Sequence, residues 1–254
     1  MRVNRLYEIE QYLIQHRSAS LEELATQFDV SLNTVRRDIK ELIARGKLEK
    51  VYGGVVLRSR QETVQPLSVR SQQNLAGKRC VGELAASLVT DNSAIFIDSG
   101  STTPHILPFL SERRNVTIIS HSLPALYEAS KYPNLNIISL GGIFNFSTAS
   151  YLDIASADKL SRITIDSVFV AATGVSVENG LTNSTYLEAE LKREIIKRTK
   201  NVILLADQSK FSRSAVITFC RFRDINHIVT DHMPDQKFME AIQAYGIDLL
   251  CPKE

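Results

Sequence analysis

The sequence predicts an α/β protein with two parts: a small helical domain that ends in a hairpin, and a larger domain with a mostly parallel sheet. Two observations support this prediction. In the first 57 residues, apolar side chains recur every three or four positions over three successive segments, which is the helical period. From residue 94 onward, short aliphatic runs alternate with helical patterns, which is typical of parallel sheets covered by helices on both faces.

Length and composition agree with this division. The chain has 254 residues, 44% of them hydrophobic, so about 195 residues remain after a first domain of about 57, enough for a second core. Cys80, Cys220 and Cys251 are too few and too scattered for a disulfide framework or a zinc site. The sequence has no basic-then-apolar leader and no apolar run near the ~20 residues that span a bilayer. We therefore expect a cytoplasmic protein without a membrane partner, a metal or another cofactor.

The first two helices are predicted from apolar spacing and capping. The segment Asn4–His16 places Leu and Ile side chains on one face and ends near the Ser18–Ser20 stretch. Ser20 followed by Glu23 is a capping box that opens a second helix. Only Asp29 and Val30 separate that helix from Ser31. The pattern therefore predicts two helices followed by a tight turn.

A third helix begins after Ser31, which is a natural N-cap. Its predicted inward face consists of Leu32, Val35, Ile39, Leu42 and Ile43. Gly46 stops the helix, and 47–56 alternates toward a hairpin that turns at Gly53 and Gly54. This order of elements is that of a winged helix-turn-helix domain, with the third helix as the reader.

The polar face of the third helix and the following wing suit double-stranded DNA. Arginine pairs with guanine and asparagine with adenine in the major groove. Over residues 31–60, eight basic side chains outnumber three acidic ones, although the whole chain carries only +2. The alternative is an ordinary solvated basic surface. The predicted DNA-binding residues are Ser31, Asn33, Thr34, Arg36, Arg37, Lys40, Lys50 and Tyr52.

The second domain follows a polar linker, 58–74, and covers 75–254. Its first helix begins at Leu75. The predicted strands are Ala94–Asp98, Val116–Ser120, Leu135–Leu140, Ser167–Ala172, Val202–Asp207 and His227–Thr230. The predicted later helices are Thr102–Leu110, Leu123–Ser130, Ile154–Ser161, Glu188–Lys200 and Lys237–Tyr245. Ligands of such sheets bind at the carboxyl ends of the strands, so these turns are the first place to look for chemistry.

The turn after the first strand is rich in hydroxyl groups and backbone N–H donors. It comprises Asp98, Ser99, Gly100, Ser101, Thr102 and Thr103. Glycine lets a ligand approach the backbone, and free N–H groups at the mouth of the next helix suit a phosphate. A plain capped turn between a strand and a helix is an equally good interpretation of this stretch alone.

Other strand ends add candidates for the same pocket. Gly141, Gly142 and Gly174 permit close approach or form tight turns, and Lys210 supplies a point charge for a phosphate. Glu188 and Lys192 lie one helical turn apart, so they either hold a sugar hydroxyl and a charge or form an ordinary surface pair. Together these turns predict a sugar-phosphate pocket.

The order of these motifs resembles the DeoR family of bacterial sugar-catabolism repressors. The resemblance rests on 31–39, the wing Val51–Gly54, 98–103, Gly141–Gly142, Glu188 with Lys192, and Ala206–Phe211. It implies a sensor domain similar to pentose-phosphate isomerases, a phosphorylated sugar or sugar-acid effector, operator DNA, and a homo-oligomer, dimer or tetramer. The stretches 173–174, 180–184 and 204–207 are most similar to the myo-inositol branch. Many relatives carry Thr-Asn at Ser120-His121 and Gly at Asp153, which leaves the effector open.

The competing interpretation is an enzyme. Asp98, Glu188 and Lys210 include the carboxylates and the amine that proton transfer beside a carbonyl needs. The protein would then be a sugar-phosphate isomerase with an appended autoregulatory DNA-binding domain. A regulator gains nothing by consuming its signal, so we expect a DNA-binding transcriptional repressor and no catalytic residues.

Overall fold

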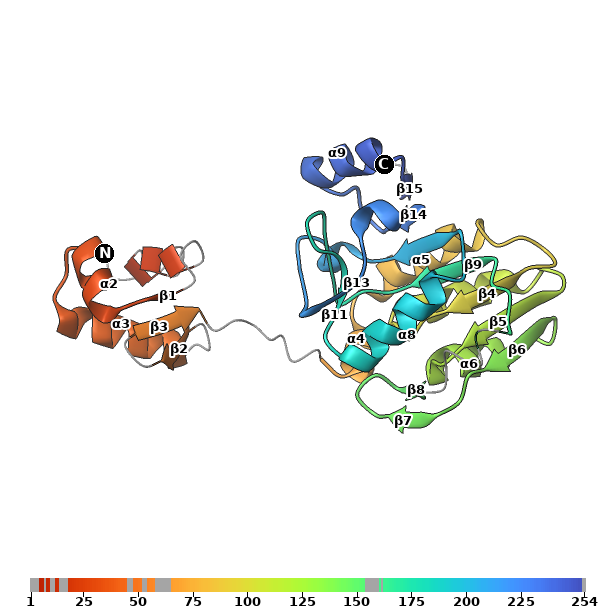
Figure 1. Cartoon of the computed structure of the whole chain (residues 1–254), viewed down its shortest axis with the longest axis horizontal. Coiled ribbons are helices and arrows are strands. Elements are labelled where there is room, and N and C mark those ends of the chain that lie inside the picture. Colours follow the sequence, from red (N-terminus) through yellow and green to blue (C-terminus); the bar gives the residue numbers. More distant parts are fainter. Residues whose placement is uncertain are drawn as a thin grey trace. The chain divides into compact units, whose positions relative to one another are not determined.

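The computed structural model describes residues 5–6, 8–9, 12–13, 18–44, 48–51, 54–57, 65–153, 160 and 162–252. The chain forms two compact units, 1–63 and 64–254. Figure 1 shows both units with their elements labelled. Each unit has its own hydrophobic core, so each is described by itself.

The first unit is a helix-turn-helix with a hairpin. Helix α2 spans Leu21–Gln27 and α3 spans Leu32–Ala44. The predicted capping box is confirmed, because the Ser20 hydroxyl accepts the Glu23 N–H at 3.0 Å while the Glu23 carboxylate accepts the Ser20 N–H at 3.3 Å. Between the helices, Asp29 has a φ of +49°. That left-handed residue produces the tight turn that the helix-turn-helix needs.

Helix α3 buries one face and exposes the other. Val35, Ile39 and Leu42 are buried in the core of this unit, as predicted. Leu32 is 38% exposed, so its predicted inward position is wrong: it is the first residue of α3, and the buried face begins with Val35. Asp38 is fully buried instead and accepts a hydrogen bond from Arg5 Nε at 2.7 Å. This ion pair ties α3 to the beginning of the chain.

The hairpin consists of β2 (Leu48–Val51) and β3 (Gly54–Leu57), which pair antiparallel. A two-residue strand, β1 (Ser18–Ala19), pairs with the other side of β3. The predicted hairpin is therefore confirmed. Gly54 opens β3, where an added Cβ would lie 2.4 Å from the Ala19 carbonyl oxygen, and Gly53 lies outside the described residues.

The second unit is built on a seven-stranded sheet. The strand order is β15-β14-β12-β9-β4-β5-β6, and every pairing is parallel. The strands are β4 (Ala94–Ile97), β5 (Val116–Ser120), β6 (Leu135–Ser139), β9 (Ser167–Val170), β12 (Val202–Leu205), β14 (His227–Val229) and β15 (Asp248–Leu250). The chain order therefore runs outward in both directions from the central pair β4 and β9.

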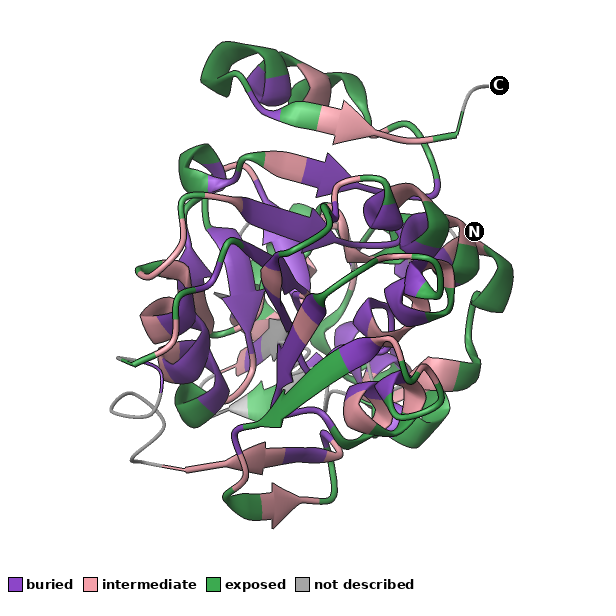
Figure 2. Ribbon diagram, turned by 90° about the vertical axis from the view of Figure 1, so that its right-hand side faces the viewer, coloured by how far each residue is buried: buried purple, intermediate pink, exposed green. Residues whose placement is uncertain are grey.

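Helices cover both faces of this sheet. Successive side chains of a strand point to opposite faces, so each strand contributes to two cores. Ile95 and Ile97 of β4 pack in one core, and Phe96 packs in the other. The elements around the sheet are α5 (Leu75–Ala86), the 3₁₀ segment η1 (Thr103–Leu110), α6 (Leu123–Ala129), α8 (Tyr186–Ile196) and α9 (Gln236–Tyr245). Figure 2 shows the buried strands between more exposed helices. The predicted fold class is confirmed.

Several described elements add to the sequence prediction. A helix, α4 (Leu67–Gln72), occupies the second half of the predicted linker and buries Leu67. The hairpin β7 (Ile143–Asn145) and β8 (Ser150–Leu152) follows β6. A small antiparallel sheet contains β10 (Gly174–Ser176), β11 (Gly180–Asn183) and β13 (Ile217–Cys220). Of the predicted helix 154–161, all but Leu160 lies outside the described residues.

The structure also bears on membrane insertion. In the part of the chain that it describes, no helix has both the length and the apolar character that a bilayer crossing requires.

Candidate functional site

The exposed face of α3 carries most of the predicted DNA contacts. Asn33, Arg36, Arg37 and Lys40 are exposed, as is Lys50 on β2. Within the described residues, none of these five side chains forms an ion pair or a hydrogen bond. Their polar groups are therefore free to meet phosphates and base edges.

Two predicted contacts have a structural task at the start of this helix. The Ser31 hydroxyl lies 2.9 Å from the Thr34 hydroxyl and accepts the Thr34 N–H at 3.2 Å. Ser31 is thus the N-cap of α3, as predicted. Tyr52 lies outside the described residues.

The second candidate site lies at the carboxyl ends of β4 and β9, where the strand order reverses. Such a reversal leaves a crevice, because the connections on its two sides leave in opposite directions. A pocket opens there. We call it the β4–β9 pocket; its lining residues are Arg70, Ser99, Gly100, Asn145, Ser147, Thr148, Ala171, Ala172, Thr173, Asn183, Ser184, Thr185, Glu188 and Lys192.

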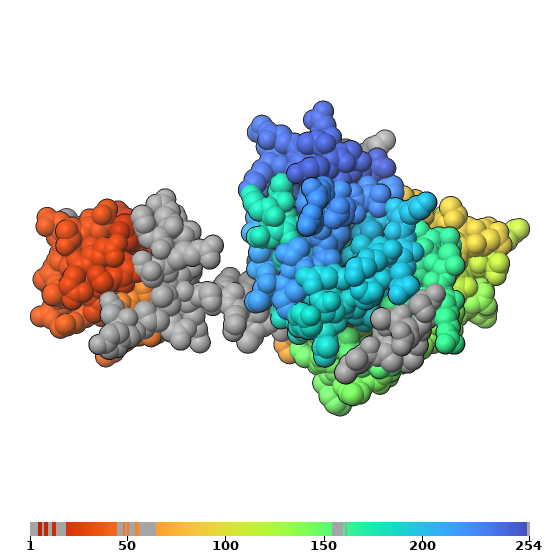
Figure 3. Space-filling view, in the orientation of Figure 1, coloured from red at the N-terminus to blue at the C-terminus, as the bar shows by residue number. Residues whose placement is uncertain are grey.

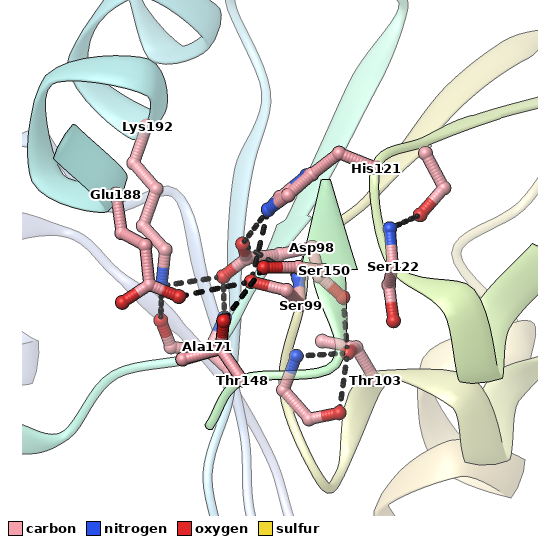
Figure 4. A network of polar contacts seen from close by, with 12 residues as sticks. Asp98, Ser99, Thr103, His121, Ser122, Thr148, Ser150, Ala171, Glu188 and Lys192 are labelled. Atoms are coloured by element: carbon pink, nitrogen blue, oxygen red, sulfur yellow. Dashed lines mark hydrogen bonds and ion pairs between the residues drawn. The ribbon is translucent and has the colours of Figure 1, made fainter. Parts of the chain in front are cut away.

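A buried ion pair forms the floor of this site. Asp98 directly follows β4 and is fully buried, and its Oδ2 lies 2.8 Å from Nζ of Lys192. The same oxygen accepts the Ala171 N–H at 2.9 Å, and Lys192 Nζ also donates to the Ala171 carbonyl at 2.8 Å. The pair thereby fastens α8 to the ends of both central strands. Figure 4 shows these contacts.

Ser99 connects a histidine to a glutamate. Its hydroxyl lies 2.9 Å from Nε2 of His121 and 3.5 Å from Oε1 of Glu188. Because a carboxylate only accepts, Ser99 donates to Glu188 and the His121 Nε2–H donates to Ser99. Burial lowers the pKa of His121, and Lys192 acts in the same direction, while Asp98 opposes them. In this arrangement the imidazole is neutral, with its proton on Nε2, and the Ser99 hydroxyl proton is directed toward Glu188.

Glu188 is held from its other oxygen as well. Oε2 accepts a hydrogen bond from Asn183 Nδ2 at 3.1 Å and another from the Thr185 hydroxyl. Thr185 precedes α8, and Glu188 lies in its first turn, where a negative charge is favoured. Glu188 and Lys192, predicted as neighbours on one helix, thus bind different partners within one pocket.

The turn after Asp98 satisfies part of its own hydrogen bonding. The Thr103 hydroxyl donates to the Asp98 carbonyl at 2.7 Å and accepts the Gly100 N–H at 3.2 Å. An added Cβ at Gly100 would lie 2.4 Å from the Cβ of Ala171. Glycine therefore lets β4 and β9 approach at this point. The structure thus contains a capped turn and, on its outer side, a pocket wall.

The structure brings together part of the predicted effector set. Asp98 lies beneath the pocket, and Ser99, Gly100, Glu188 and Lys192 line it. The remaining predicted residues are outside the lining: Ser101, Thr102 and Thr103 are buried in the turn, Gly141 and Gly142 follow β6, Gly174 lies in β10, and Lys210 lies in the 3₁₀ segment η2 (Gln208–Lys210).

Several lining residues were not predicted from the sequence. Asn145, Ser147 and Thr148 come from the β7–β8 hairpin, and Arg70 comes from α4. Burial lowers the pKa of Arg70, while Glu188 and Asp98 oppose this shift. Figure 3 shows the surfaces of α8 and the hairpin on the same side of the second unit. No local sequence pattern indicates these contacts, because they join segments far apart in the chain.

Both units of the chain match known protein families. The DeoR-like helix-turn-helix domain matches residues 5–61, and the DeoR C terminal sensor domain matches residues 73–232. The chain belongs to the DeoR family of helix-turn-helix transcriptional regulators. All residues that line the β4–β9 pocket except Arg70 thus lie in the DeoR sensor domain, and α3 lies in the DeoR helix-turn-helix domain.

Individual relatives cover the full chain. The HTH-type transcriptional regulator IolR of Bacillus subtilis (strain 168) is 37% identical over 249 residues, which are 98% of this chain and 99% of IolR. The HTH-type transcriptional repressor GlcR of the same organism is 28% identical, over 98% of this chain and 96% of its own. Ribose 5-phosphate isomerase A from Methanocaldococcus jannaschii aligns with a TM-score of 0.41 and 20% identity, over 55% of each chain.

Proposed function

We propose that this DeoR-family regulator represses a carbohydrate-catabolism operon and is released from its operator by a phosphorylated sugar or sugar acid. The observation that carries the proposal is the β4–β9 pocket, in which Arg70 and Lys192 accompany hydroxyl and amide groups. Cations together with directed hydrogen bonds suit a ligand that has both an anionic group and hydroxyls.

The DNA side of the proposal rests on the free polar face of α3. Arg36, Arg37 and Asn33 are exposed and without partners in the described part of the chain. Operators are read by paired helices at a fixed spacing, so the repressor would act as a homo-oligomer, either a dimer or a tetramer. Its place of action would be the cytoplasm. The names of GlcR and IolR, a repressor and a regulator, support this role.

The mechanism is a two-state coupling. In one state the oligomer presents its reader helices at the spacing of the operator, and in the other it does not. An effector that binds the second state more tightly lowers the operator affinity by its differential binding free energy. The resemblance of 180–184 to the myo-inositol branch, together with the 37% identity to IolR, favours an operon related to that branch.

Binding is a better role for the pocket than catalysis. A general base must be within hydrogen-bond reach of the proton that it abstracts, and Asp98 is not among the residues that line the pocket. Asp98 already accepts bonds from Ser99, Ala171 and Lys192. Glu188 accepts hydrogen bonds through both of its oxygens. We therefore propose that the protein is not an enzyme.

The test is a thermal-shift screen of the full-length protein. The panel contains glucose 6-phosphate, ribose 5-phosphate, 6-phosphogluconate, their unphosphorylated forms, and myo-inositol. A compound at a hundredfold its dissociation constant should stabilise the protein by about 2.7 kcal/mol. Each stabilising compound is then added to the protein on operator DNA, and release is measured by fluorescence anisotropy.

The outcomes separate the candidate functions. Stabilisation by phosphorylated compounds together with loss of operator binding supports the repressor. Conversion of a sugar phosphate to its isomer at a catalytic rate would establish the enzyme instead. Tighter operator binding in the presence of the compound would mean that the effector acts with DNA rather than against it.

A further inference from the structure

Helix α4 supplies the pocket with a cation, Arg70, that has no ion-pair partner among the described residues. Arg70 lines the β4–β9 pocket and is half-buried. Its side chain donates one hydrogen bond, from Nε to the Gln65 carbonyl at 2.9 Å, and within the described residues it forms no ion pair. In the described part of the chain, the terminal amino groups of its guanidinium form no hydrogen bond.

The other charges of the pocket already have partners. Lys192 is paired with Asp98 at 2.8 Å. Glu188 is held by neutral donors from Ser99, Asn183 and Thr185. An anionic ligand would therefore have to break the Asp98 pair to use Lys192. It can bind Arg70 without breaking an ion pair, because Glu188 and Asp98 act on Arg70 through their charge and not by direct contact. A partly desolvated guanidinium is also a strong bidentate donor to carboxylate or phosphate.

We propose that Arg70 binds the anionic group of the effector and, through α4, transmits its binding to the DNA-binding unit. This inference rests on the proposed function of the β4–β9 pocket as the effector site. It adds the residue that recognises the anion and the element that carries the signal.

The contacts of α4 explain how a ligand at Arg70 would act on a whole helix. The buried Lys78 donates from Nζ to the carbonyl oxygens of Arg70 and Gln73, the latter at 2.6 Å. At the other end, the Leu67 N–H donates to the Ser147 carbonyl at 3.0 Å. Helix α4 is thus fastened at one end to α5, through Lys78, and at the other to Ser147, which lines the pocket. A shift of Arg70 would therefore act on the whole helix.

The position of α4 along the chain supports its proposed role in transmitting effector binding. The boundary between the two units lies at residues 63 and 64, and α4, which begins at Leu67, is the first described helix beyond it. Because α4 is the described helix nearest in sequence to that boundary on the sensor side, the proposed transmission of effector binding is assigned to this helix. Energetic coupling of this kind is reciprocal: bound operator must change the effector affinity by the same factor.

The first experiment measures affinity. Full-length wild type, Arg70→Gln, Arg70→Lys and Arg114→Ala are titrated calorimetrically with the panel compound that binds wild type best, and with inorganic phosphate. Loss of a charged hydrogen bond should weaken binding of the phosphorylated compound by about 10- to 100-fold in Arg70→Gln. Arg70→Lys should lose less affinity, because lysine keeps the positive charge but cannot donate two parallel hydrogen bonds to the anion. Arg114, an exposed arginine remote from the pocket lining, is the matched control and should behave as wild type.

The second experiment measures coupling at saturation. Operator affinity is determined with and without saturating compound in wild type, Arg70→Gln and Thr173→Val. Thr173 lines the same pocket but is not part of α4. Both variants should need more compound, but Arg70→Gln should also release operator less at saturation, whereas Thr173→Val should retain the full wild-type release.

The results separate this inference from the function on which it rests. If no compound and no phosphate binds wild type, the proposed function fails and the role of Arg70 fails with it. If wild type binds and responds while Arg70→Gln binds equally well, only the anion contact is overturned. Full release of operator from saturated Arg70→Gln would overturn the coupling role of α4. Melting temperatures establish that each variant is folded, and Arg70→Lys replaces Arg70→Gln if the latter is not.

Discussion

On helix α3 the cationic side chains Arg36, Arg37 and Lys40 are exposed and, among the described residues, unpaired. In the β4–β9 pocket Lys192 is only 3% exposed and lies 2.8 Å from Asp98. The difference follows from the two ligands. A polyanion is bound by charges that displace counterions and need no fixed geometry, whereas a small ligand is selected by groups held in one arrangement.

The comparison has consequences for stability. Exposed charges contribute little to folding because water solvates them in both states. Buried charges are costly unless each retains its partner. Substitutions on α3 should therefore change DNA binding with little effect on stability, and substitutions in the pocket should change stability as well as ligand binding. Four experiments test this contrast.

The largest effect is expected at Lys192. Replacing it by Met leaves Asp98 as an uncompensated buried charge, so the free energy of unfolding should fall by about 3–5 kcal/mol in urea denaturation. Lys197→Met on the same helix is the control: Lys197 is 66% exposed and pairs with Glu194 at the surface, and should cost little. Adding Asp98→Asn to Lys192→Met should restore part of the stability. If both single variants lost the same small amount of unfolding free energy, buried and exposed charges would not differ in their effect on stability.

The next effect concerns base reading by α3. Arg36→Ala should weaken operator binding by about 1–3 kcal/mol if the guanidinium contacts a base edge, while the urea midpoint stays near that of wild type. Fluorescence anisotropy with operator and with random DNA measures both affinities. The same loss on both DNAs would show that Arg36 contacts phosphate and does not read sequence.

A smaller effect is expected from pH. Burial lowers the pKa of His121 in the folded protein, so the unfolded state binds a proton first. The stability that the protein gains from a neutral, buried His121 is complete above the unfolded pKa of about 6.5. It is lost as the pH falls below that value, by at most about 1.4 kcal/mol per pH unit. His121→Asn, which keeps a donor for Ser99, should have a flatter profile between pH 7.5 and 5.5. Parallel profiles for the two proteins would show that His121 does not take up the proton.

The smallest effect is expected on the wing. Lys50→Ala should weaken binding to operator and random DNA alike, and it should reduce the slope of log K against log salt by about 0.9, which is the contribution of one phosphate contact. The measurement is a salt titration of the affinity for each DNA. An unchanged slope would show that Lys50 points away from the phosphates.

Much of the fold is predictable from the sequence because its signals are local. The strand Val116–Ser120 and the start of α5 at Leu75 agree with the structure, since aliphatic runs and helical spacing mark them directly. The strand Asp248–Leu250 was missed because it is short and lies at the sheet edge. Helix α4 was missed because a six-residue polar helix has little periodicity and is stabilised by contacts elsewhere in the unit.

The candidate site was predictable only in part, because a sequence reveals strand ends but not strand order. Lys210 follows β12 and Gly141 follows β6, and each of these strands lies two positions from β4 in the sheet. With strands about 4.8 Å apart, such residues begin about 10 Å from Asp98. Arg70 and Thr148 reach the pocket from segments whose own sequences show no sign of it. Long-range packing decides these memberships.

The reversal of strand order at β4 and β9 also determines the order in which parts of the chain fold during synthesis. Phe96 pairs with Val168, and Asp98 meets Lys192, so the pocket cannot close before residue 192 has left the ribosome. The first unit ends at residue 63 and has a core of its own. Domains fold as units as they emerge, and distant pairings form last. A nascent chain therefore acquires its DNA-reading helix well before it acquires the pocket.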